Sequence, residues 1–153
     1  MSEAAHQGQC RCGEVHFAAR GAPLITMACH CRGCQQMSAS AFSLSSLYSA
    51  ERFDVTSGTP ERGGLGTGPT HMFCSSCMTW LYTVPEGMDD FVNVRSTMFD
   101  GAGEHRPFIE TYRSEGLAWA NSGAARSYET EPEHSEFGEL IAAYGHWVER
   151  VQR

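Results

Sequence analysis

Seven cysteines, grouped in three short clusters, constrain this 153-residue chain more than any other feature of its sequence. The clusters are Cys10-Arg-Cys12, Cys29-His-Cys31-Arg-Gly-Cys34 and Cys74-Ser-Ser-Cys77. Cysteines at this spacing are typical of metal-binding knuckles, because two thiolates of one short turn can reach the same ion. The first residues have neither the basic start nor the apolar stretch of a signal peptide, so we expect a cytoplasmic protein in a reducing compartment. Metal ligands or working thiols therefore explain the cysteines better than disulfides do.

Counting ligands divides the cysteines between two zinc ions. A structural zinc takes four soft ligands in a closed tetrahedron, whereas a catalytic zinc keeps three protein ligands and one open position. The two pairs from distant parts of the chain predict a structural zinc, held by Cys10, Cys12, Cys74 and Cys77. The remaining three cysteines predict a second zinc that is open to substrate, held by Cys29, Cys31 and Cys34.

Other interpretations of the clusters remain open. Both zinc ions could be structural, with His30 or His71 as the fourth ligand of the three-cysteine group. His30 stands between two ligands on a tight knuckle, so we expect its ring to point away from the metal and to support or pack against the ligands. Cys74 and Cys77 could also form a redox pair, although no βαβ pattern surrounds them.

Composition excludes several classes of function. All eleven basic residues are arginines, so the chain has no lysine for a P-loop, a Schiff base or an amine nucleophile. The formal net charge is −7, and no basic patch is evident, which argues against a nucleic-acid partner. Apolar runs are too short for a membrane span, so we expect no membrane association through one.

Hydrophobic patterning predicts one mainly β domain over residues 1–153, with a C-terminal amphipathic helix. The expected strands are residues 14–17, 24–28, 42–48, 53–56, 72–74, 80–83, 91–95 and 108–112. Residues 63–69 are rich in glycine and predict a flexible connection. The helix is expected over about 135–151, capped by Thr130 or Ser135. Its apolar stripe is Phe137, Leu140, Ile141, Tyr144, Val148 and Val151.

Five segments in order resemble the motifs of one known family. The segments are Gly8–Phe17, Cys29–Cys34, Ser38–Phe42, Phe73–Cys77 and Asn93–Asp100. They are similar to G-x-C-x-C-G-x-V-x-F, C-H-C-x-x-C, S-G-x-A-F, F-C-x-x-C and V-x-x-G-x-L-D of the glutathione-dependent formaldehyde-activating family, which includes centromere protein V. The resemblance implies a zinc-bound, mostly antiparallel β architecture resembling a tent.

The resemblance covers about residues 8–119, with two departures. Ala39 stands where the family usually has glycine after Ser38, and Met78 stands where glycine usually follows the second C-x-x-C. Both leave the metal ligands intact. The family implies that glutathione sulfur takes the open zinc position and that formaldehyde adds to it, giving S-hydroxymethylglutathione, or that this adduct breaks down in reverse.

The chemistry of three thiolates agrees with that implication. A zinc ion with three thiolates has a net charge near −1 and suits the holding and deprotonation of a further thiol. We therefore expect a carbon–sulfur lyase that acts on a glutathione or other thiol adduct; the competing hypothesis is a zinc-stabilised binding or interaction module without turnover. Arg32 is the candidate anchor for a substrate carboxylate, or else an exposed arginine. Phe42, Trp80 and Trp119 are expected in the core rather than in a pocket.

Overall fold

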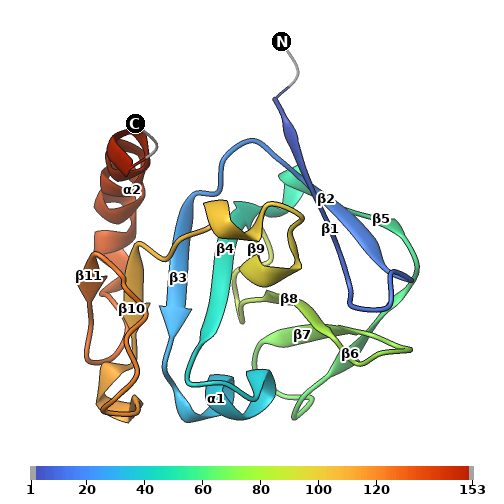
Figure 1. The fold of residues 1–153 in the computed structure, drawn as a ribbon, viewed down its shortest axis with the longest axis horizontal. Helices are drawn as coiled ribbons and strands as arrows, with labels where there is room; N and C mark the ends of the chain where they lie inside the picture. The colour runs from blue at the N-terminus through green and yellow to red at the C-terminus, as the bar shows by residue number, and fades with distance from the viewer. Residues whose placement is uncertain (1–2, 152–153) are drawn as a thin grey trace. The chain divides into compact units, whose positions relative to one another are not determined.

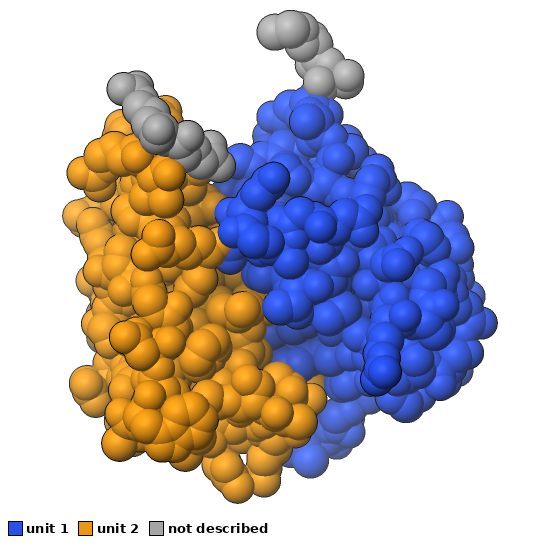
Figure 2. Space-filling view, viewed as in Figure 1, with its two compact units in different colours: residues 1–23, 46–105 blue, residues 24–45, 106–153 orange. Residues whose placement is uncertain are grey.

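The computed structural model describes residues 3–151 of the 153-residue chain. The chain forms two compact units, which Figure 2 shows in different colours. Unit 1 comprises Met1–Pro23 and Ser46–His105, and unit 2 comprises Leu24–Ser45 and Arg106–Arg153. Strand β4, Ser43–Ser49, carries the chain from unit 2 into unit 1. Each unit contains one of the two cysteine groups.

Unit 1 contains a three-stranded antiparallel sheet in the order β1-β2-β5. Its strands are β1 (Ala5–Gln9), β2 (His16–Arg20) and β5 (Phe53–Ser57). Gly8 of β1 pairs with Phe17 of β2, and a Cβ on this glycine would lie 2.3 Å from the Phe17 ring. Only glycine therefore allows β1 to lie this close to the aromatic core.

Four further antiparallel strands of unit 1 follow the order β9-β8-β7-β6. They are β6 (Pro60–Gly63), β7 (Thr70–Cys74), β8 (Trp80–Val84) and β9 (Phe91–Arg95). Residues 63–69 join β6 to β7, so the glycine-rich segment is the expected connection between two elements. Short 3-10 helices lie at Ala50–Arg52, Ser96–Met98 and Ala102–Glu104.

The core of unit 1 is aromatic and aliphatic, and two cysteines belong to it. Phe17, Tyr48 and Leu81 are fully buried, and the same cluster includes Cys10 and Cys74. Burying apolar side chains contributes roughly 1.5 to 3 kcal/mol each, so this cluster dominates the stability of the unit. The thiols of Cys10 and Cys74 are therefore held by the packed core rather than by a surface loop.

Unit 2 is built around short parallel strands and two helices (Figure 1). Its elements are β3 (Ile25–Cys29), α1 (Arg32–Ser38), β10 (Ile109–Thr111), a 3-10 turn (Arg113–Glu115), β11 (Arg126–Ser127) and α2 (Phe137–Val151). Strand β10 lies between β3 and β11 and is parallel to both. The register sets Thr111 opposite Cys29, so the end of β10 lies beside the three-cysteine cluster.

Helix α2 packs its apolar stripe against unit 2, and Figure 1 shows it alongside β10 and β11. Leu140 and Tyr144 are buried, and the Tyr144 ring contacts Phe108 with centroids 5.8 Å apart. A 3-10 turn, His134–Glu136, precedes the helix. Its capping box uses the side chains of Glu133 and Glu136, so the expected caps Thr130 and Ser135 are wrong.

The mainly β class with a C-terminal helix is confirmed. The sheets are mixed, because β10 pairs in parallel with two neighbours, which the expectation of antiparallel sheets did not include. Helix α1 and strands β1, β6 and β11 were not predicted. Within residues 3–151, no helix is long and apolar enough to cross a membrane. The assignment of residues 1–153 to a single domain stays a prediction.

Candidate metal centres

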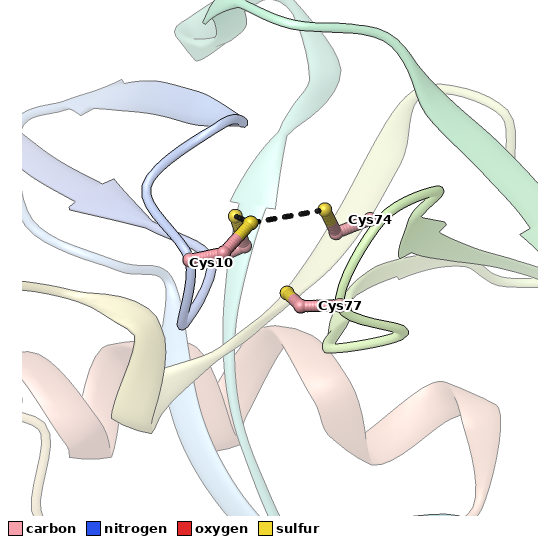
Figure 3. A group of neighbouring side chains, drawn as sticks. Cys10, Cys74 and Cys77 are labelled. Carbon is pink, nitrogen blue, oxygen red and sulfur yellow. Dashed lines mark hydrogen bonds between the residues drawn. The ribbon is translucent and has the colours of Figure 1, made fainter.

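The first group of thiols lies in unit 1 and unites two distant turns. Cys10 and Cys12 follow β1, whereas Cys74 ends β7 and Cys77 lies in the turn before β8. The four sulfur atoms all lie within 4.8 Å of one another. Figure 3 shows the sulfur atoms of Cys10, Cys74 and Cys77 turned toward one another. The structure thus brings together the four residues predicted to form the closed site.

Backbone hydrogen bonds shape both turns. The N–H of Gly13 donates to the carbonyl of Cys10 at 3.1 Å, and the N–H of Met78 donates to the carbonyl of Cys74 at 3.0 Å. The N–H of Val15 points at Cys10 Sγ at 3.3 Å, which stabilises negative charge on that sulfur. These turns hold the sulfurs before any ion binds. The donor set, four thiols, suits a soft or borderline metal ion.

The thiol of Cys77 ionises more readily than an ordinary cysteine thiol. The Thr79 hydroxyl lies 3.0 Å from Cys77 Sγ and lowers the pKa of that thiol to about 5. Thiolate is the form that binds metal, so this hydrogen bond favours the ligating state.

The second group of thiols lies in unit 2, where β3 meets α1. Cys29 ends β3, Cys31 is the N-cap of α1, and Cys34 lies in the first turn of that helix. The three sulfur atoms lie within 4.8 Å of one another, and all three residues are half-buried. The sulfur of Cys31 accepts a hydrogen bond from the Cys34 N–H at 3.3 Å. Helix capping and clustering of the thiols therefore use the same short segment.

One thiol of this group ionises much more readily than its neighbours. Hydrogen bonds from the Cys29 and Cys34 thiols lower the pKa of Cys31 to about 2. The same contacts, from Cys29 and then Cys31, raise the pKa of Cys34. Without a metal, the cluster therefore holds one thiolate, Cys31, which the neighbouring thiols stabilise as hydrogen-bond donors.

The three-cysteine group contains no fourth histidine, cysteine or carboxylate ligand among the residues that the structure describes. His30 is engaged elsewhere, because its ring nitrogens lie 2.8 Å from Glu110 Oε2 and 3.2 Å from the Arg113 guanidinium. His71 belongs to unit 1, where its Nδ1 lies 2.9 Å from the Thr83 hydroxyl. Neither histidine proposed as a fourth ligand is therefore part of the group.

Comparison with known proteins shows the family to which the chain belongs. The family model for the glutathione-dependent formaldehyde-activating enzyme matches residues 5–115. The chain belongs to this family. No curated protein matches the sequence significantly.

A solved structure supports the fold. The crystal structure of a Rhodobacter sphaeroides protein is similar, with 19% sequence identity and a TM-score of 0.50. The match covers 62% of this chain and 88% of that chain. At this identity it supports the fold and nothing more.

The match to the formaldehyde-activating family includes all seven cysteines and ends before β11 and α2.

The two residues that depart from the family motifs share a backbone conformation. Ala39 has φ of 49° and Met78 has φ of 57°, both in the left-handed region where glycine is favoured. The glycines usual in the family thus correspond to conformational needs of the two turns, and this chain meets the same needs with bulkier residues.

The candidate substrate residues have different surroundings. The Arg32 guanidinium donates to Gln35 Oε1 at 3.2 Å on its own helix. Phe42 packs on the His30 ring, with centroids 5.1 Å apart. Trp80 is buried in unit 1, as expected for a core residue. The guanidinium carbon of Arg95 lies over its ring, 4.1 Å from the ring centroid. Trp119 is 78% exposed, so its assignment to the core is wrong.

Glu110 and Arg113, the two residues that hold His30, belong to no motif of the sequence. They are separated from His30 by 80 and 83 positions. No local spacing joins them, and only the parallel pairing of β10 with β3 brings them together. The apolar residues of 108–112 predicted the strand but gave no sign of these contacts.

Proposed function

We propose that Cys29, Cys31 and Cys34 hold a zinc ion that accepts a substrate thiol, and that the protein is a zinc-dependent carbon–sulfur lyase. The observation that supports this proposal is the difference between the two groups. One group offers four thiol ligands, and the other offers three and no further described ligand. A tetrahedral ion bound by the second group has one position left for an exogenous ligand.

Glutathione is the proposed thiol, since the family description names glutathione and formaldehyde. Bound zinc would favour the thiolate form of the substrate sulfur. In the forward direction a sulfur–carbon bond forms, the carbon–oxygen π pair moves to oxygen, and oxygen takes up the thiol proton. The product is S-hydroxymethylglutathione, and the reverse reaction breaks the same carbon–sulfur bond.

The protein's part in this reaction is to hold the sulfur ligands and to bind the charged ends of the tripeptide. Glutathione carries two carboxylates, which need arginine or backbone N–H donors in a chain without lysine. Arg32 lies inside the three-cysteine segment and is the proposed anchor for one of them. Its bond to the neutral Gln35 amide is weaker than a bond to a carboxylate, so substrate can displace it.

Cys10, Cys12, Cys74 and Cys77 are proposed to hold a structural zinc. Four ligands leave no position for substrate, and two of the thiols are buried in the core of unit 1. The proposed complement is therefore two zinc ions per chain. We also propose a reducing compartment, since all seven cysteines are free thiols.

X-ray absorption at the zinc edge, with and without glutathione, tests the proposal. We expect about two zinc ions per chain, and a gain of one sulfur ligand at one of them when glutathione is added. Cys34→Ser should abolish the gain, whereas a variant of a surface residue, Glu129→Ala, should keep it. A zinc environment unchanged by glutathione would contradict the proposal and would favour a binding module without turnover.

A further inference from the structure

We propose that Glu110 and Arg113 are positioning residues, which lock His30 in one tautomer and so fix the geometry of the three-cysteine metal site. The inference rests on the proposed function, because it takes Cys29, Cys31 and Cys34 to be metal ligands. It assigns a role to three residues that lie outside the sulfur cluster itself.

Every polar group of His30 has a hydrogen-bond partner. The ring nitrogens face Glu110 Oε2 at 2.8 Å and Arg113 at 3.2 Å. The backbone N–H donates to the Thr111 carbonyl at 3.0 Å, and the backbone carbonyl accepts from Gln35 Nε2 at 2.7 Å. The residue has no exposed surface, so water cannot replace any lost partner.

These partners determine the tautomer of the ring. A guanidinium only donates hydrogen bonds, so the Nδ1 atom that faces Arg113 must accept and carries no proton. A carboxylate only accepts, so the Nε2 atom that faces Glu110 carries the proton. The contacts therefore favour Nε2 as the donor and Nδ1 as the acceptor, with each ring nitrogen matched to a partner of the opposite kind.

The two partners are themselves held in place. Glu110 Oε2 also accepts from the Ser122 hydroxyl at 2.6 Å, and Arg113 also donates to the Ala120 carbonyl at 3.3 Å. Arg113 Nε lies 3.8 Å from Glu110 Oε1. Ser122 and Ala120 lie beyond the part of the chain that the family model matches, so the support for His30 extends into a segment outside that match.

The consequence for the metal site follows from the position of His30. It is the residue between the ligands Cys29 and Cys31, so any rotation of its backbone changes the directions of both neighbouring Cα–Cβ bonds. A site with fixed ligands binds metal more tightly, because the ordering has been done in the folded protein. Loss of the Glu110 acceptor leaves a buried imidazole N–H without a partner, and the knuckle must move to relieve it.

The test measures metal affinity rather than turnover. Cobalt(II) and zinc(II) competition titrations would compare wild type with Glu110→Ala, with the four-cysteine group as an internal reference. We expect Glu110→Ala to weaken binding at the three-cysteine group about 10- to 100-fold and to change its cobalt spectrum, with the four-cysteine group unchanged. Glu110→Gln keeps an acceptor oxygen and should bind close to wild type.

The matched control is Glu129→Ala, which removes an exposed carboxylate of the same unit. Equal affinities of Glu110→Ala and Glu129→Ala at the three-cysteine group would overturn the proposal. A measurement on the wild-type protein is independent of whether a variant folds: nitrogen-15 NMR of the histidine ring should show His30 protonated at Nε2 alone. Protonation at Nδ1, or at both nitrogens, would overturn it. If glutathione fails to bind while these effects persist, the proposed function is wrong and the positioning role stands.

Discussion

At the scale of single residues, three side chains of the described residues lie where the backbone favours glycine, those of Ala39, Met78 and Tyr112. Met78 and Ala39 have positive φ values, and both follow a cysteine segment. A left-handed conformation costs an L-residue roughly 1 to 2 kcal/mol more than it costs glycine. Part of this difference is offset, because glycine loses more conformational entropy than other residues when the chain folds. The two turns are therefore slightly strained, although their ligands are in place.

Replacing Met78 by glycine should stabilise the protein. We expect Met78→Gly to raise the free energy of unfolding by roughly 0.5 to 1 kcal/mol, because relief of the left-handed strain exceeds the added entropy of the unfolded chain. The methionine is exposed, so the change removes little packing. Urea denaturation measures it. As a control, Ala142→Gly in the helical backbone of α2 should lower the free energy of unfolding by about 1 kcal/mol. If both variants lowered it by the same amount, the prediction for Met78→Gly would be wrong.

His105 predicts a dependence of stability on pH. Burial, together with the nearby charge of His6, lowers the pKa of His105 to about 4, against the opposing effect of Glu104. The unfolded chain, with a pKa of 6.5, binds a proton between these two values that the folded protein does not bind. Stability is therefore fully present above pH 6.5 and falls as the pH drops toward 4, by up to about 3 kcal/mol.

The comparison of wild type with His105→Gln isolates this effect. The glutamine can keep a hydrogen bond to the Ser46 hydroxyl, which lies 2.7 Å from His105 Nδ1. We expect the unfolding free energy of the variant to fall less steeply between pH 6.5 and 4. His146→Gln, which removes an exposed histidine, should keep the wild-type slope. Parallel slopes for wild type and His105→Gln would contradict the prediction.

At the scale of elements, the sequence predicted what a local pattern encodes. The apolar stripe of α2 repeats over four turns, so it was predicted with nearly correct bounds. Helix α1 has only seven residues, too few for a hydrophobic period, and its start depends on the sulfur of Cys31 as a cap. The parallel pairing of β10 with β3 joins residues about 80 positions apart, and no spacing within either strand encodes it.

The same distinction holds for the site. The cysteine clusters could be predicted because ligands of one knuckle are neighbours in the sequence. Glu110 and Arg113 could not, because they reach His30 through the pairing of β10 with β3. Trp119 was misassigned for a related reason: an aromatic side chain indicates burial on average, and the surroundings of a single loop residue are set by the fold.

Helix α2 should be held in place mainly by its buried stripe. Leu140 is 2% exposed, and we expect Leu140→Ala to cost about 2 to 4 kcal/mol through lost burial and the cavity left behind. Glu139→Ala, at the neighbouring exposed position, should change stability by less than about 0.5 kcal/mol. Thermal melts followed by circular dichroism compare the two variants. Similar melting temperatures would show that the stripe does not carry the packing energy of the helix.

At the scale of the whole molecule, the two cysteine groups should contribute differently to stability. Cys10 and Cys74 belong to the buried core of unit 1, and their group joins turns that are more than 60 residues apart in the sequence. The three cysteines of unit 2 are half-buried and lie within one six-residue segment. A metal that joins distant segments restricts the unfolded chain far more than one that binds a single short loop.

Removal of one ligand from each group should therefore have unequal effects. We expect Cys10→Ser or Cys77→Ser to lower the melting temperature strongly, because a closed zinc site can contribute about 10 kcal/mol or more to a small domain. Cys31→Ser should bind less metal but melt close to wild type, since its segment stays in place through the hydrogen bonds of His30 and Gln35. Melts with and without a chelator, together with metal analysis, measure both effects. If Cys31→Ser unfolds while Cys10→Ser and Cys77→Ser melt like wild type, the structural and open sites have been assigned the wrong way round.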